Sequence, residues 1–341
     1  MITYRNQIAY FDYDSAVLKG NPLGDPSLRE LPVLLPPTYQ DEPNRRFPVI
    51  WVLAPFTSWG EKLFNLAAWD ESIVQRADRL MRAGEMLPSI LAFPNAFTRF
   101  GGSQYLNSPA VGRYHDYIVD ELVPFVDRSL RTLAHRDNRA VVGHSSGGYG
   151  ALMFAMRCPD VFAAAASHSG DMFFEACYWP DIPGAVRTLS RYDSVKKFTD
   201  ELKLMTHTRD GGRDWFSALS LCAMSACYSP NSDSEVGFDL PFDTYTGEIR
   251  HSVWDRWREL DPVHAGQAQL ESLRGLKALY LDCGTYDEFN LVLGARRFHR
   301  MLQAADIGHV YEEFEGSHHN LNWRYARSLP LLARAISSSQ K

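Results

Sequence analysis

The alternation of apolar runs with helical repeats along the first half of the chain predicts its fold class. Short apolar runs have the length and composition of buried strands at residues 29–35, 48–54, 88–93, 139–143 and 161–167. Between several of these runs, apolar residues recur at helical spacing, over residues 70–83, 112–134 and 149–156. Strands that alternate with helices in this way indicate a mostly parallel α/β sheet with helices on both faces. A looser alternation over residues 2–18 predicts an additional edge strand.

The pattern changes over residues 171–275, which we call the cap segment. This segment is rich in aromatic residues and polar turns, and its helical patches are short. A connection of this length inside an α/β domain is typical of a lid or cap near a site. Its aromatic side chains either line a pocket for a bulky apolar group or form a small core of the cap itself. The sequence leaves both interpretations open.

The strand and helix pattern resumes after the cap segment. We expect a strand at residues 276–283, a helix at about 290–305, a last strand at 309–314 and a closing helix at about 323–337. The chain is therefore predicted to form a single α/β domain over residues 1–341, with the cap segment inserted before the strand at 276–283. In the helix over residues 112–134, Pro124 is expected to produce a kink because it lacks an N–H group.

The sequence G-H-S-S-G at residues 143–147 lies between a predicted strand and a predicted helix. Strand, sharp turn and helix form the context in which G-x-S-x-G becomes a nucleophile elbow. Gly143 and Gly147 would let the strand and helix approach closely, and Ser145 would be held in a strained conformation with its hydroxyl exposed. The amide of Ser146 would then point at a developing oxyanion. The alternative is a glycine- and serine-rich turn without chemistry.

A reactive serine needs a histidine base, and the base needs a carboxylate that orients it. In proteins with such an elbow, the chain order is serine, acid, histidine. Asp287 lies on the loop after the strand at 276–283 and is our candidate acid, with Glu288 as the second choice; Asp282 is expected to point into or along the sheet. His318 follows the last strand and is our candidate base, with His319 as the second choice.

Two further histidines lie near the elbow in sequence. His144 is adjacent to Ser145 and cannot easily face it, whereas His168 follows the neighbouring strand and is expected to form part of a pocket wall. Neither is our candidate base.

At these motifs the chain resembles the esterase D-like, or "putative esterase", branch of the α/β-hydrolases. That branch includes feruloyl esterases, S-formylglutathione hydrolases and bacterial mycolyltransferases. The similarity covers nearly the whole chain and is carried by G-N-P-L-G-D-P, G-H-S-S-G-G-Y-G-A, C-G-T-Y-D-E-F and G-S-H-H-N-L-N-W-R. The resemblance implies an α/β-hydrolase fold with Ser145 as nucleophile, Asp287 as acid and His318 as base. It favours His318 over His319, since His318 stands at the family's usual distance before Trp323.

The chain departs from many of these relatives after the strand at 48–54. They have His-Gly or a similar pair there, whereas this chain has Ala54 and Pro55. Because Pro55 has no N–H, it cannot donate to an oxyanion. We therefore expect the amides of Phe56 and Ser146 to form the oxyanion hole, with Thr57 as a weaker alternative to Phe56.

Composition limits the partners. The formal net charge is −6 and no basic patch stands out, which disfavours nucleic acid and anionic membranes. The five cysteines include no C-x-x-C pair, and two acidic stretches lack the spacing of a calcium loop, so we expect no metal and no cofactor. No apolar run is long enough to span a bilayer and no signal-peptide pattern opens the chain, so a cytoplasmic protein is expected.

These observations predict a serine hydrolase that cleaves a small-molecule carboxylic ester or thioester through an acyl-enzyme on Ser145. Acyl transfer to a sugar or alcohol, peptide hydrolysis and a non-catalytic binding role remain alternatives. The natural substrate and the presence of a homo-oligomer are left open by the sequence.

A histidine base works only while its imidazole is neutral. Hydrolysis of a p-nitrophenyl ester should therefore decrease as the pH falls below roughly 6–7. A pH–rate profile tests this prediction, and a flat acid limb down to about pH 4 would contradict a histidine base.

Overall fold

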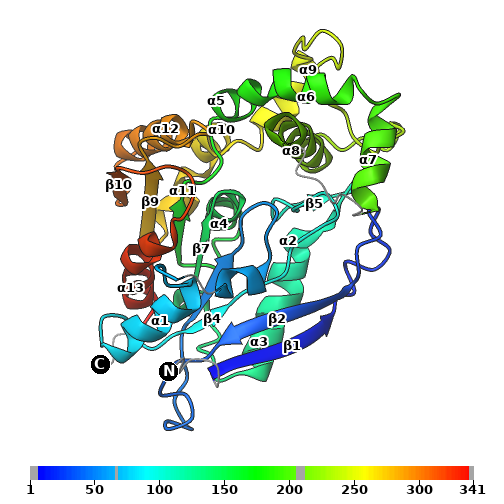
Figure 1. Cartoon of the computed structure of the whole chain (residues 1–341). Helices are drawn as coiled ribbons and strands as arrows, with labels where there is room; N and C mark the ends of the chain where they lie inside the picture. Colours follow the sequence, from blue (N-terminus) through cyan, green and yellow to red (C-terminus); the bar gives the residue numbers. More distant parts are fainter. Residues whose placement is uncertain (1–6, 66–67, 205–211, 338–341) are drawn as a thin grey trace.

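The computed structural model describes residues 7–65, 68–204 and 212–337. A twisted sheet forms its centre, and helices flank the sheet on two sides (Figure 1). The strands are β1 (Ile8–Asp14), β2 (Leu28–Leu34), β3 (Val49–Leu53), β4 (Ile90–Ala92), β5 (Asn107–Ser108), β6 (Gly112–Arg113), β7 (Arg139–His144), β8 (Ala164–His168), β9 (Ala278–Gly284) and β10 (Val310–Phe314). The strands expected from the apolar runs are all present, with small shifts at their ends.

Eight of these strands form one sheet in the order β1-β2-β4-β3-β7-β8-β9-β10. The pairs from β4 to β10 are parallel, whereas β1 pairs antiparallel with β2 and β2 pairs antiparallel with β4. Strands β5 and β6 form a separate two-stranded ribbon. The mostly parallel order confirms the predicted fold class, and it places the carboxyl ends of β7, β8, β9 and β10 along one edge.

The helices connect the strands or belong to the cap segment. They are α1 (Ile73–Arg82), α2 (Tyr114–Asp116), α3 (Val123–Ser129), α4 (Ser146–Arg157), α5 (Phe174–Tyr178), α6 (Ile182–Leu189), α7 (Val195–Lys203), α8 (Gly212–Tyr228), α9 (His251–Arg258), α10 (Pro262–Ala265), α11 (Leu270–Arg274), α12 (Leu291–Ala304) and α13 (Tyr325–Ile336). Short 3₁₀ turns extend several of them.

The two faces of the sheet bury separate apolar clusters. In β3, Ile50 and Val52 pack with α1 and α13 on one face, whereas Trp51 and Leu53 belong to the cluster on the opposite face, with α4 and α12. This alternation is the period of two expected of a strand. Because both faces are covered, the central strands are almost wholly apolar, as the sequence pattern indicated.

The helix expected over residues 112–134 is shorter and less regular. A π-helical stretch, Tyr117–Leu122, lies between α2 and α3, and Pro124 falls in the first turn of α3. The N–H of Val123 bonds to the carbonyl of Ile118, five residues earlier. The wider π turn places Pro124 where the helix needs no N–H donor from it, and a kink of the helix axis at Pro124 stays a prediction.

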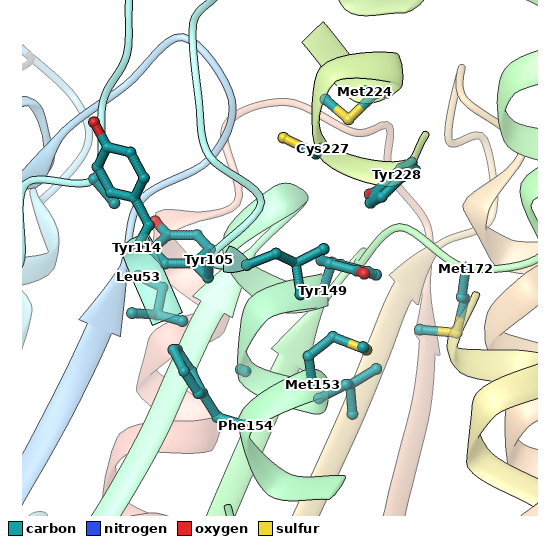
Figure 2. Packing of buried hydrophobic residues seen from close by; sticks show 14 of the residues in the cluster. Leu53, Tyr105, Tyr114, Tyr149, Met153, Phe154, Met172, Met224, Cys227 and Tyr228 are labelled. Atoms are coloured by element: carbon teal, nitrogen blue, oxygen red, sulfur yellow. The ribbon is translucent and has the colours of Figure 1, made fainter. Parts of the chain in front are cut away.

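The cap segment lies beyond the carboxyl ends of the strands, with α8 above α4 (Figures 1 and 2). Figure 2 shows Met224 and Tyr228 of α8 facing Tyr149 of α4 across this boundary. The rings of Tyr149 and Tyr228 lie 5.8 Å apart. The helices at the end of the segment, α10 and α11, pack against α12 and α4. A lid function for the segment stays a prediction.

Most aromatic residues of the cap segment form its own core. The indole rings of Trp254 and Trp257 stack at 5.3 Å, and the ring of Phe174 stacks on Tyr228 at 5.0 Å. Trp257 is fully buried. This arrangement favours the second interpretation of the aromatic residues, because these rings are enclosed and cannot meet a ligand.

A buried ionic network joins β8, β9 and α13. The carboxylate of Asp282 accepts hydrogen bonds from His168 Nδ1 at 2.8 Å and from Arg324 Nε at 2.6 Å. The other ring nitrogen of His168 lies 2.8 Å from the hydroxyl of Ser328. Burial by itself raises the pKa of Asp282, but His168 and Arg324 lower it further than burial raises it. Asp282 therefore points into the packed layer under the sheet, as predicted.

The same network corrects the expectation for His168. Its side chain is fully buried between β9 and α13, and its ring packs against Tyr325 at 4.6 Å. His168 is therefore not part of a pocket wall. The side chain points to the face covered by α13, and sequence position alone could not tell the two faces apart.

Removing one partner from this network should be costly. Asp282→Ala would leave Arg324 and His168 buried without their carboxylate, and the free energy of unfolding should decrease by about 3–5 kcal/mol. Urea unfolding measures this change. Asp214→Ala is the matched control, since Asp214 pairs with Arg187 at the surface; its unfolding midpoint should hardly move. Equal effects of the two variants would contradict a structural role for the network.

Candidate active site

Ser145 stands on a sharp turn between β7 and α4. Its backbone has φ 56° and ψ −126°, a conformation that costs a residue with a side chain about 1–3 kcal/mol. The surrounding backbone leaves no room for relaxation. A Cβ on Gly143 would lie 2.3 Å from the carbonyl carbon of Gly147, and a Cβ on Gly147 would lie 2.2 Å from the carbonyl oxygen of Leu53. The two glycines are therefore required by close approach, as the motif predicted.

The structure brings the three residues of the predicted triad together. The Ser145 hydroxyl lies 2.9 Å from His318 Nε2, and His318 Nδ1 lies 2.8 Å from Asp287 Oδ2. When Nδ1 donates its proton to Asp287, Nε2 carries none and accepts the Ser145 O–H. His318 and Asp287 are buried, so little water competes for these hydrogen bonds.

The second-choice residues occupy different positions. Glu288 accepts the backbone N–H of His318 at 2.7 Å, so it holds the loop that carries the imidazole. His319 is exposed, and its own N–H lies 3.4 Å from the hydroxyl of Ser317. Neither side chain takes part in the hydrogen bonds that join Ser145, His318 and Asp287.

The carboxylate of Asp287 is fixed from its other side. Its Oδ1 accepts the backbone N–H groups of Phe289 at 3.0 Å and Leu291 at 3.4 Å. The thiol of Cys283, at the end of β9, lies 3.8 Å from Oδ2. These contacts leave Oδ2 aimed at the imidazole, so the acid can hold one tautomer of His318.

The imidazole of His318 is held between two rings. The ring of His144 packs against the imidazole of His318, with the ring centroids 4.7 Å apart. The ring of Phe289 makes an edge contact with the same imidazole, also at a centroid distance of 4.7 Å. Burial lowers the pKa of His144 well below its usual range, and the nearby imidazoles of His318 and His168 lower it further. His144 therefore stays neutral and adds no positive charge beside His318. Sequence adjacency to Ser145 suggested no such role.

Two backbone amides are available for an oxyanion. Ser146 is the first residue of α4, where the N–H groups have no helical acceptor. In the described part of the chain, neither the N–H of Ser146 nor that of Phe56 donates to a protein acceptor. The alternative donor, Thr57, is already bonded to the carbonyl of Gly101 at 2.8 Å. Phe56 and Ser146 therefore remain the proposed oxyanion hole, and Thr57 is excluded.

A small cavity opens beside the Ser145 hydroxyl. Its volume is about 40 Å³, and it extends under the cap segment. The lining residues come from the elbow, the loops after β3, β8 and β9, and the cap helices: Phe56, Ser145, Ser146, Asp171, Cys177, Tyr178, Asp181, Phe216, Ser220, Met224 and Phe289. The cap segment thus supplies the greater part of this wall.

Two acidic residues of this lining, Asp171 and Asp181, were not assigned a function from the sequence. One signal was available, since Asp171 follows the carboxyl end of β8, which neighbours the elbow strand in the predicted order. No local pattern distinguished Asp181 from surface acids of the cap.

One group of side chains in the described part of the chain has the composition of a metal site. Glu175, Asp261 and His264 place ligand-type atoms within 4.8 Å of one another. The carboxylate of Asp261, however, already accepts the backbone N–H groups of Phe173 and Phe174, each at 2.9 Å. These hydrogen bonds, which fix the start of α5, account for the buried Asp261 without an ion. In the helices that the structure describes, no stretch is long and apolar enough to cross a membrane.

Comparison with solved structures supports the fold. The chain is similar to a ferulic acid esterase, with 19% identity, a TM-score of 0.61 and coverage of 96% of this chain and 98% of that one. It is also similar to an S-formylglutathione hydrolase from Staphylococcus aureus, with 18% identity, a TM-score of 0.57 and coverage of 96% and 99%. At this level of identity, the similarity establishes the α/β-hydrolase fold.

Comparison with curated proteins and family models gives the family. An esterase of Mycobacterium tuberculosis (strain ATCC 25618 / H37Rv) is 28% identical over 194 residues, which cover 53% of this chain. The chain matches only 37% of that relative's length. An endo-1,4-β-xylanase/feruloyl esterase of Xylanibacter ruminicola is 27% identical over 137 residues, which cover 38% of this chain and 17% of the relative. A family model described as "Putative esterase" matches residues 27–328. The chain therefore belongs to this esterase family, as its motifs indicated.

Proposed function

We propose that this chain hydrolyses a carboxylic ester or thioester through an acyl-enzyme on Ser145. The observation that carries the proposal is the unbroken line of hydrogen bonds from the Ser145 hydroxyl through His318 to Asp287. The line begins at the strained elbow, which has two unpaired amides beside it, and membership of an esterase family agrees with this chemistry.

In the first step, His318 Nε2 takes the proton of Ser145 while the serine oxygen attacks the carbonyl carbon. The amides of Phe56 and Ser146 bind the oxyanion that forms, and each such donor contributes roughly 10²–10³ in rate in comparable sites. Asp287 stabilises the imidazolium of His318. The imidazolium then gives its proton to the departing alcohol or thiol, which leaves an acyl group on Ser145.

In the second step, water repeats the sequence. His318 removes a proton from the water, whose oxygen attacks the acyl carbon, and the bond to Ser145 breaks. The serine oxygen recovers its proton from the imidazolium. The net reaction consumes one ester and one water and gives one acid and one alcohol, and the chemistry uses only side chains and amides of this chain.

Acyl transfer and peptide hydrolysis would use the same atoms, with another acceptor or another leaving group. A binding protein without activity would have no need of the strained serine. Product analysis with sugar and alcohol acceptors, together with a panel of amide substrates, separates these alternatives from ester hydrolysis.

The chain provides an internal control for the nucleophile, because Ser328, His168 and Asp282 form a second serine–histidine–aspartate line. Ser328 is fully buried and cannot meet a reagent. Ser145→Ala should remove labelling by a fluorophosphonate and reduce hydrolysis of a p-nitrophenyl ester by up to about 10⁶-fold. Ser328→Ala should keep the labelling. Labelling that survives Ser145→Ala would contradict the assignment of the nucleophile.

Substitutions of the two neighbouring acids, Asp287 and Glu288, should differ sharply in their effect on kcat. Asp287→Asn removes the acceptor that fixes the His318 tautomer, and kcat should fall by about 10⁴-fold. Glu288→Gln keeps an acceptor near the His318 N–H, so its kcat should fall far less. Steady-state kinetics on both variants tests this order, and the reverse order would make Glu288 the acid.

A further inference from the structure

The cavity beside Ser145 contains a carboxylate with one free oxygen. Asp171 is 6% exposed and lines the cavity. Its Oδ2 accepts hydrogen bonds from Gln104 Nε2 at 3.1 Å, from the Tyr178 hydroxyl at 3.1 Å and from the Ser146 hydroxyl at 3.3 Å. Among the described residues, no donor reaches Oδ1. One oxygen is therefore held in place by three neutral groups, and the other remains available to a molecule in the cavity.

A second carboxylate repeats this arrangement. Asp181 is 8% exposed and lines the same cavity. The Ser217 hydroxyl donates to its Oδ1 at 2.9 Å, and no described donor reaches Oδ2. The hydrogen-bond partners of both carboxylates are thus uncharged, and no basic side chain in the described part of the chain forms an ion pair with Asp171 or Asp181.

Burying these two carboxylates without an ion-pair partner has a cost in free energy. Burial raises the pKa of Asp171 and that of Asp181, since water no longer solvates the charged form. For Asp171, the hydrogen bonds and the nearby His318 offset part of this rise. A ligand that brings a hydrogen-bond donor or a positive charge would replace the missing solvation.

The remaining walls limit the size of that ligand. Phe56, Phe216, Met224 and Phe289 close the cavity with apolar surface, and its volume is about 40 Å³. Pockets for drug-sized ligands measure about 300–1,000 Å³, so this cavity accepts only a short group. The oxygen of Asp171 that is not free, Oδ2, accepts a hydrogen bond from Ser146, the neighbour of the nucleophile, so the free Oδ1 of the same carboxylate also lies near Ser145. The donor on the ligand must therefore be close to the carbonyl that Ser145 attacks.

The cavity suits the acyl part of the substrate. During hydrolysis the alcohol must leave so that water can reach the acyl-enzyme, whereas the acyl group stays bound to Ser145 through both steps. A small cavity whose walls are mostly buried residues is suited to the acyl group, which stays bound.

We propose that this cavity selects short acyl groups that carry a hydrogen-bond donor near the carbonyl, and that Asp171 is the side chain that binds this donor. The donor is a hydroxyl or an ammonium group. Asp181 lines the same cavity and adds negative charge, which favours such groups over aliphatic ones. This inference rests on the proposed acyl-enzyme at Ser145.

Three ethyl esters of nearly equal size test the proposal. Ethyl butanoate ends its acyl chain in a methyl group, ethyl 3-hydroxypropanoate in a hydroxyl and ethyl 3-aminopropanoate in an ammonium. We expect kcat/KM for at least one donor-bearing ester to exceed that for the butanoate by about tenfold or more, as for a hydrogen bond to a charged group. Which of the two is faster identifies the donor. A preference for the butanoate would overturn the proposal.

Variants test whether Asp171 is the residue that causes the preference for donor-bearing acyl groups. Asp171→Asn removes the charge at constant size, and the ratio of kcat/KM between the preferred ester and the butanoate should fall toward one. Asp255→Asn, on the exposed face of α9, is the matched control and should leave the ratio unchanged. An unchanged ratio in Asp171→Asn would overturn the assignment to Asp171.

The two levels of the proposal fail differently. A wild-type protein that reacts with a fluorophosphonate and hydrolyses ethyl butanoate best would contradict the acyl selectivity and leave the hydrolase intact. A wild-type protein that neither reacts with the fluorophosphonate nor cleaves any ester would contradict the proposed function itself. If Asp171→Asn does not fold, the ester ratio of the wild-type protein still decides the selectivity.

Discussion

The close contact between β7 and α4 is the constraint on which the site depends. The backbone of Gly147 leaves no room for a Cβ on Gly143, the carbonyl of Leu53 at the end of β3 leaves none for a Cβ on Gly147, and the turn between the two glycines holds Ser145 at a positive φ. The N–H of Ser145 is bonded to the carbonyl of His168 at 2.9 Å, so the neighbouring strand holds the strained turn. Because the hydroxyl is fixed in this way, the base and acid need only reach one point at the edge of the sheet.

The part of the chain that the structure describes contains two lines of serine, histidine and aspartate with nearly the same hydrogen-bond lengths. Only the one at Ser145 combines a strained serine, free amides and an adjoining cavity. The line at Ser328 is buried between β9 and α13, where Arg324 neutralises the acid and no substrate can enter. The structural line at Ser328 and the proposed reactive line at Ser145 thus share their hydrogen-bond geometry. They differ in whether a substrate can reach the serine and in the backbone strain at the serine.

A few residues of the cap segment shape the cavity beside Ser145, and most of its large side chains do not face that cavity. Its large aromatic residues pack on one another, with Trp257 fully enclosed, and so stabilise the cap without meeting a ligand. The part that faces Ser145 contributes Phe216 and Met224 together with two carboxylates. The cavity is therefore small, its walls are largely apolar, and Asp171 and Asp181 make it acidic at two points. Such chemistry favours a compact polar acyl group over a bulky apolar one, which was one of the two interpretations that the sequence left open.

The sequence alone predicted the order of strands and helices and the elbow, and it singled out Ser145, Asp287 and His318 as the first choices for the triad. These features depend on short-range patterns, namely strand periodicity, glycine spacing and the position of loops after strands. Only the tertiary structure decided that Glu288 holds the base loop, that His168 lies under the sheet, and that Asp171 faces the cavity. The partners of these side chains are distant in sequence, as Gln104 is from Asp171, and side-chain direction follows from which elements pack together.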